Sequence, residues 1–172
     1  MAAEMSRISA RISVLIVLTQ DRRKVLHFNV TEYPTAQWTA QQFVEAFPWE
    51  TVPKYLLRDR DAVHGKWFQR RMTSLGMDQV LTAPRSLWQN AYTERVIGSI
   101  RRDCLDQVVL FNEDHLRHLL TSYFHYYHRW RTPLALAMEC PESRPVLPPD
   151  RGVGVAFPEV GGLHHHYERI AA

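Results

Sequence analysis

The sequence predicts an α/β fold in which a mixed β-sheet is flanked by helices. An apolar, β-branched run over residues 12–20 is followed at once by a second strand-like run over 24–31, as in a hairpin. Shorter strand-like runs then alternate with segments of helical periodicity, which is typical of parallel strands joined by helices. With 172 residues and 45% apolar content, the chain is long enough to bury a core of its own.

Each later element has a local signal in the sequence. The first helix begins after Pro34 and Thr35, and its apolar residues recur at helical spacing up to Phe47. A short apolar strand over 55–57 then leads into the charged stretch 58–61. The remaining predicted elements are a helix over 66–75 followed by Gly76, a strand over 79–82, a loop over 84–92, a helix over 93–105, and a long helix with Asn112 as its N-cap.

Composition divides the chain into three parts. Residues 1–11 are small and polar without any periodicity, so we predict an irregular segment there. Residues 12–135 contain the predicted strands and helices and form the predicted core. Residues 136–172 are rich in Pro and Gly, so we predict an extended C-terminal tail.

Bulk properties limit the compartment more than the function. The formal net charge of +3 permits a nucleic acid partner without requiring one. The longest apolar run, 14–18, is too short to span a bilayer and lacks the features of a signal peptide, so we expect a cytoplasmic protein with no membrane partner. Cys104 and Cys140 show neither the spacing of a disulfide framework nor that of a zinc site.

Two carboxylates at the ends of predicted elements are the candidates for chemistry. Asp59 directly follows a strand, where α/β sheets place their sites, and Glu94 lies in the first turn of a helix. If the fold brings them together, a divalent metal ion between them would offset their repulsion. The same residues could instead be a turn residue and a helix-capping charge, and residue spacing alone leaves both interpretations open.

Three segments of the chain resemble the integrase-like catalytic core of bacterial insertion-sequence transposases. They are 57–61 (LRDRD) with Phe68, 83–95 (APRSLWQNAYTER), and 126–134 (YYHRWRTPL) with Pro141. Asp59 and Glu94 lie 94 − 59 = 35 positions apart, close to the spacing of the second and third carboxylates in this DDE family. The resemblance covers roughly residues 12–145. It implies a ribonuclease H-like fold and phosphoryl transfer on DNA that depends on Mg²⁺ or Mn²⁺.

The same resemblance implies roles for individual residues. Asp59 and Glu94 would be catalytic and would bind the metal, whereas Asp61 stands where many relatives carry glycine and is interpreted as a loop charge. The expected DNA-binding residues are Trp88, Gln89, Asn90, Arg95, Arg101 and Arg102. Trp88 could stack on a base or close the edge of the domain, and Arg95 could make only a local ion pair. The implied partners are transposon ends and target DNA, with a homo-oligomer holding the DNA ends together.

The family's first aspartate is missing from its expected place. Relatives carry it on a strand upstream of the hairpin, but no aspartate precedes Ile12, and Asp21 falls in the hairpin turn. Glu4 is the only substitute in range, and its neighbours do not resemble a buried strand. We therefore expect a missing or degenerate first strand, an N-terminally truncated chain and impaired activity. The alternative is an inactive transposase remnant that binds DNA or a sister transposase.

Overall fold

The computed structural model describes residues 1–8, 12–47, 52–83, 90–133 and 136–171. These residues form two compact units, which we call the N-terminal unit (Met1–Gly98) and the C-terminal unit (Ser99–Ala172). Within the described ranges, no helix combines the length and the apolar character needed to cross a membrane.

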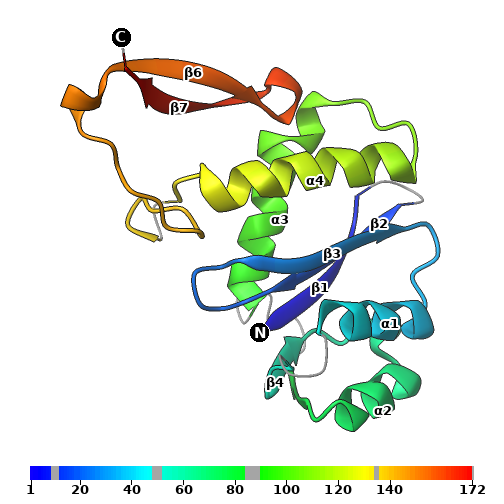
Figure 1. The fold of residues 1–172 in the computed structure, drawn as a ribbon. Helices are drawn as coiled ribbons and strands as arrows, with labels where there is room; N and C mark the ends of the chain where they lie inside the picture. Colours follow the sequence, from blue (N-terminus) through cyan, green and yellow to red (C-terminus); the bar gives the residue numbers. More distant parts are fainter. Residues whose placement is uncertain (9–11, 48–51, 84–89, 134–135, 172) are drawn as a thin grey trace. The chain divides into compact units, whose positions relative to one another are not determined.

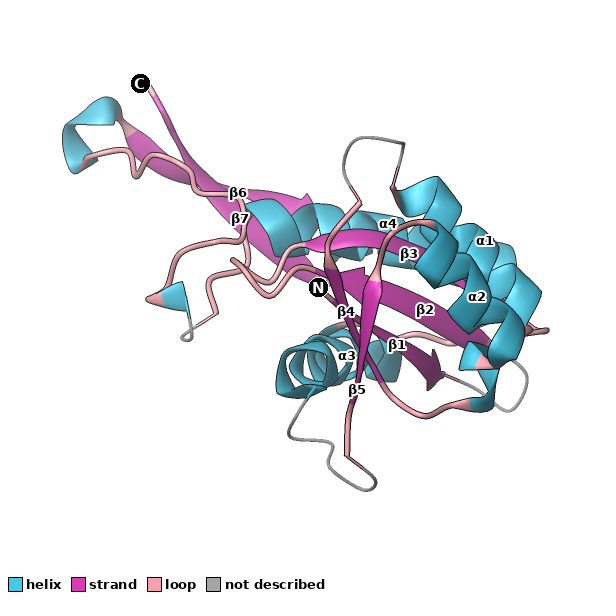
Figure 2. Cartoon of the chain, turned by 90° about the horizontal axis from the view of Figure 1, so that it is seen from below, coloured by secondary structure: helices cyan, strands magenta, loops and turns pink. Residues whose placement is uncertain are grey.

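The N-terminal unit is built on a mixed sheet (Figure 1). Its described strands are β1 (Ala2–Arg7), β2 (Ser13–Leu18), β3 (Val25–Thr31), β4 (Tyr55–Arg58) and β5 (Asp78–Leu81). They lie in the order β3-β2-β1-β4-β5, with antiparallel pairs on the β3 side of β1 and parallel pairs on the β5 side (Figure 2). The predicted α/β class with a mixed sheet is confirmed.

The central strand β1 is formed by residues that the sequence predicted to be irregular. It pairs with β2 along its whole length, from Ala2 opposite Leu18 to Arg7 opposite Ser13, and with β4 near its start. Ala2 and Ala3 are buried. The prediction of an irregular segment is therefore wrong for residues 2–7. Of the expected missing or degenerate first strand, the missing strand is wrong because β1 is present. The segment has no strand pattern of its own because pairing with distant strands on both sides determines its conformation.

Helices α1 (Ala36–Ala46) and α2 (Lys66–Ser74) pack with the sheet and with each other. Thr35 caps α1 as predicted, its hydroxyl oxygen accepting from the N–H of Trp38 at 3.1 Å. The buried core here consists of Ala3, Leu15, Val17, Ala40, Phe43, Phe47, Leu56, Phe68, Met72 and Met77. Phe43 and Phe68 meet edge-on with ring centroids 5.3 Å apart, which ties the two helices together.

Helix α3 (Ala91–Asp103) runs from the N-terminal unit into the C-terminal unit. The C-terminal unit also contains α4 (Glu113–Arg129), which Asn112 caps as predicted by accepting from the N–H of His115 at 2.8 Å. The tail ends in an antiparallel hairpin of β6 (Val153–Glu159) and β7 (His164–Ile170), which the sequence analysis did not predict. Its turn uses positive φ angles at Gly161 and Gly162, so the glycines that indicated an irregular tail instead permit a tight turn.

Candidate active site

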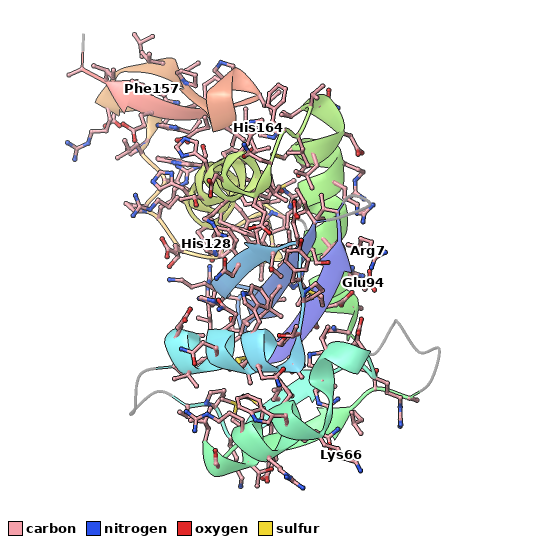
Figure 3. The ribbon with its side chains drawn as sticks, turned by 90° about the vertical axis from the view of Figure 1, so that its right-hand side faces the viewer. Arg7, Lys66, Glu94, His128, Phe157 and His164 are labelled. Atoms are coloured by element: carbon pink, nitrogen blue, oxygen red, sulfur yellow. The ribbon has the colours of Figure 1, made fainter. Side chains whose placement is uncertain are left out.

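Three carboxylates come near one another beside the inner strands β1 and β4 of the N-terminal unit. β1 and β4 are parallel, and Ala3 lies opposite Arg58. The next residues along the two strands are Glu4 and Asp59, so the register places them side by side. Glu94 comes from the first turn of α3 (Figure 3). The charges of both Asp59 and Glu94 act on Glu4, which shows that three elements far apart in the sequence supply one site.

Glu4, which the sequence analysis set aside, is held in place by two buried residues. Its Oε2 accepts a hydrogen bond from Nδ2 of Asn90 at 2.8 Å, and Oδ1 of Asn90 accepts one from the hydroxyl of Thr93 at 2.8 Å. Asn90 is 6% exposed and Thr93 is fully buried. The hydrogen bond from Thr93 therefore orients the side-chain amide of Asn90, so that its N–H group points at Glu4. The one signal in the sequence is that Glu4 is the only acidic residue before Asp21.

The surroundings of Glu4 raise its pKa to about 8. Burial is the largest cause, followed by the charge of Glu94, a hydrogen bond with the Glu94 carboxyl group and the charge of Asp59, while the bond from Asn90 acts in the opposite direction. A hydrogen bond between two carboxyl groups requires a proton on one of them. Glu4 and Glu94 are thus brought together in a way that is unfavourable unless a proton or a cation lies between them.

Asp59 is held by contacts within its own loop. Its Oδ1 accepts from the N–H of Asp61 at 3.1 Å and lies 3.0 Å from Nδ1 of His64. Burial alone would raise the pKa of Asp59, but the contacts with His64, the N–H of Asp61 and the charge of Arg58 outweigh it and hold the pKa below its ordinary value. Asp59 is therefore ionised at neutral pH, whereas Glu4 binds a proton much more tightly.

The donor set fits a divalent cation of the magnesium class, which takes carboxylate oxygens. Within the described ranges, no three histidine, cysteine, aspartate or glutamate side chains are already arranged to hold a metal ion. Glu4 and Glu94 are in hydrogen-bond contact, whereas Asp59 reaches Glu4 through its charge. Three negative charges repel one another, so the carboxylate of Asp59 would join those of Glu4 and Glu94 only around a bound cation.

The residues expected to bind DNA fall in different places. Three of them are exposed on α3, namely Arg95, Arg101 and Arg102. Trp88 and Gln89 lie outside the described residues. Asn90 is buried, and its amide is engaged with Glu4 and Thr93. The structure thus brings together Glu94, Asp59, Asn90 and the unforeseen Glu4, while the arginines stand on the outer surface of the helix.

Comparison with known proteins gives a match to a family model and matches to solved structures, one of which is described here. Residues 75–141, which include Asn90 and Glu94, match the family model described as integrase core domain. The fold is similar to that of a chain in the cryo-EM structure of the simian T-cell lymphotropic virus intasome in complex with the PP2A regulatory subunit B56 gamma, with 14% sequence identity and a TM-score of 0.65. The match covers 96% of the present chain and 64% of that chain, so the present chain spans under two thirds of its length. Comparison with curated proteins gave no match. The expected integrase-like core is thus supported by the family match over residues 75–141, and the expected fold by the similarity to an intasome chain.

Proposed function

We propose that this integrase-like core carries out metal-dependent phosphoryl transfer on DNA, as in integration or transposition. The observation that carries the proposal is the convergence of Glu4, Asp59 and Glu94 from β1, the end of β4 and the start of α3. The integrase core match over 75–141 and the structural likeness to an intasome chain support the same conclusion. DNA is therefore the substrate that the chemistry and the comparisons favour together.

In this proposal the three carboxylates hold Mg²⁺ or Mn²⁺. When bound, the ion would stabilise charge on the phosphoryl group and lower the pKa of the attacking hydroxyl. Glu4 would be one of the residues that hold the ion, and the hydrogen bond from Asn90 keeps its carboxylate oriented. Asp59 enters already ionised, with Oδ1 held by the N–H of Asp61. The third ligand that the sequence analysis found lacking is, in this proposal, Glu4.

The proposed partners are transposon ends and target DNA, and the proposed source is a bacterial insertion sequence whose transposase acts in the cytoplasm. The exposed Arg95, Arg101 and Arg102 would contact the DNA backbone, since a guanidinium group binds phosphate oxygens in a bidentate manner. Holding two DNA ends at once would require a homo-oligomer with one active site for each end.

The test is a nicking assay on supercoiled plasmid with the purified chain and Mn²⁺. We expect nicked product from the wild-type chain and a loss of rate on the order of 10³-fold in both Asp59→Asn and Glu94→Gln, because these groups act as one unit. Robust nicking by Asp59→Asn would sink the assignment of that residue. A wild-type chain that binds a DNA duplex but never nicks the plasmid would instead identify it as an inactive remnant.

Asp61→Asn is the matched control. Asp61 lies two positions from Asp59 in the same loop, is exposed, and accepts a hydrogen bond from the N–H of Val63 at 3.1 Å. An asparagine caps a helix end nearly as well as an aspartate, so the loop conformation is preserved. This variant removes one negative charge from the same loop without changing Asp59. We expect it to nick the plasmid at the wild-type rate.

A further inference from the structure

His64 is a buried imidazole whose hydrogen bonding is incomplete. It lies in the short helix η1 (Ala62–His64), five positions after Asp59, and its side chain is wholly inaccessible to solvent. Nδ1 lies 3.0 Å from Oδ1 of Asp59, yet neither ring nitrogen makes a well-angled hydrogen bond within the described part of the chain. Burying polar atoms in this state costs about 1–3 kcal/mol, which proteins tolerate mainly at functional sites.

The imidazole ring is fixed, whereas the carboxylate beside it can turn. The His64 ring packs against Phe68 with centroids 4.8 Å apart at 62°, and the backbone carbonyl of His64 accepts from Nε2 of Gln69 at 3.1 Å. Asp61 caps the other end of η1. The Asp59 side chain is 36% exposed, and the last torsion of an aspartate is broad. A small rotation of the carboxylate would therefore complete the bond to a stationary ring.

The position of the proton on the ring follows from the same contacts. A proton on Nε2 would be buried without an acceptor, and the lone pair on Nδ1 would then face a carboxylate oxygen at 3.0 Å. A proton on Nδ1 points at Oδ1 of Asp59 and replaces the repulsion there by a hydrogen bond, and it leaves only the lone pair on Nε2 without a partner. The arrangement therefore favours an Nδ1–H donor directed at Asp59.

We propose that His64 is a positioning residue for Asp59. Its Nδ1–H and the N–H of Asp61 together hold Oδ1, which leaves Oδ2 to face the cation. This inference rests on the proposed function, since it explains how one of the three carboxylates is oriented. A neighbouring hydrogen-bond donor of this kind commonly changes metal affinity about 10- to 100-fold.

The competing explanation is that His64 only fills space in the core. Phenylalanine has a similar size and could make the same contact with Phe68 without burying polar atoms. If His64 were only a filler, His64→Phe would be at least as stable as the wild type and would bind metal equally well. Asparagine, in contrast, places an N–H near the position of Nδ1, so His64→Asn retains the donor while losing part of the ring.

The first test measures Mn²⁺ binding to the full chain by electron paramagnetic resonance. We expect His64→Phe to bind Mn²⁺ about tenfold more weakly than the wild type and His64→Asn to recover most of the loss. In the plasmid assay, His64→Phe should need more Mn²⁺ for half-maximal nicking while its rate at saturating Mn²⁺ stays near wild type. Thermal unfolding checks that each variant is folded. Unchanged Mn²⁺ affinity in a folded His64→Phe would overturn the proposal.

The second test needs no metal and separates this proposal from the proposed function. Nitrogen NMR of ¹⁵N-labelled histidine in the metal-free chain reports which nitrogen of His64 carries the proton. We expect a protonated Nδ1 whose signal shifts in Asp59→Ala and not in Asp61→Asn. If the His64 Nδ1 signal did not shift in Asp59→Ala, the proposed role of His64 would be overturned. A wild-type chain that binds no Mn²⁺, but shows the expected NMR response, would overturn the proposed function and still support the His64–Asp59 pair.

Discussion

Acidic side chains gather in both units, but their partners differ. In the C-terminal unit, Asp103 accepts from the hydroxyl of Tyr123 at 3.1 Å and from Nε of Arg131 at 2.9 Å, and Glu159 lies 2.9 Å from Nδ1 of His166. In the N-terminal unit, Glu4 meets a second carboxyl group rather than a cation. Acidic groups that are all paired with donors or cations are typical of a structural cluster. Acidic groups held next to one another instead indicate a ligand-binding site.

The aromatic side chains sharpen the same contrast. In the C-terminal unit, the ring centroid of His166 lies 3.9 Å from that of Trp130 and 5.1 Å from that of Phe157, and the ring of His164 stacks on Tyr126 at 4.6 Å. These contacts join the β6–β7 hairpin to α4 and its C-terminal end. His164 and His166 are therefore engaged in packing. In the N-terminal unit, the one buried histidine described at the site is instead left with incomplete hydrogen bonds.

The largest effect expected is that of Glu4→Gln on catalysis. Glutamine can still accept the hydrogen bond from Asn90, so the local fold should persist, but it removes one negative oxygen ligand. We expect nicking to fall on the order of 10³-fold. Glu4→Asp keeps the charge but shortens the side chain, and we expect an intermediate rate. Full activity of Glu4→Gln would show that Glu4 is not part of the site.

The next effect is on stability and belongs to the C-terminal unit. Asp103→Ala leaves the Tyr123 hydroxyl and the Arg131 guanidinium without their partner, and both sides of the Asp103–Arg131 ion pair are only 24% exposed. We expect the free energy of unfolding to fall by about 3 kcal/mol, measured by urea denaturation followed by tryptophan fluorescence.

Asp150→Ala is the control for this variant. Asp150 is exposed in η5 (Pro149–Arg151), and its loss should change the free energy of unfolding by less than about 0.5 kcal/mol. Mn²⁺ affinity should be unchanged in folded Asp103→Ala. A stability loss no larger than that of the control would show that the Asp103 cluster is not structural.

The smallest effect is the pH dependence of stability in metal-free protein. The pKa of Glu4 rises from 4.5 to about 8 on folding, so the folded chain binds this proton more tightly than the unfolded chain between those values. The stabilisation is therefore present at low pH and is lost as the pH rises towards 8, with an upper bound of about a few kcal/mol. Thermal unfolding in EDTA at pH 5.5 and 8.5 measures it. If Glu4→Gln lost as much stability between these two pH values as the wild type, the pH dependence would have to come from another group.

Local patterns predicted most of the elements. The apolar run that became β2 is buried along its whole length, and the caps Thr35 and Asn112 are where the sequence indicated. Asp59 and Glu94 were predicted as site residues because each stands at the end of an element with a strong local signal. Glu4 was not found, because β1 is a strand only through its pairing with β2 and β4. His64 gave no signal either, since its burial and its distance to Asp59 depend on packing.

The sequence by itself determined the α/β class, the capped helices and the integrase resemblance, and it indicated two of the three proposed carboxylates, because these depend on neighbours within a few positions. The tertiary structure decided the rest. Register between parallel strands placed Glu4 beside Asp59, and a buried hydrogen bond from Asn90 fixed its orientation. Such relations join residues as many as 86 positions apart, and no local periodicity records them. The strand that the sequence analysis expected to be missing is thus the one that carries the third carboxylate.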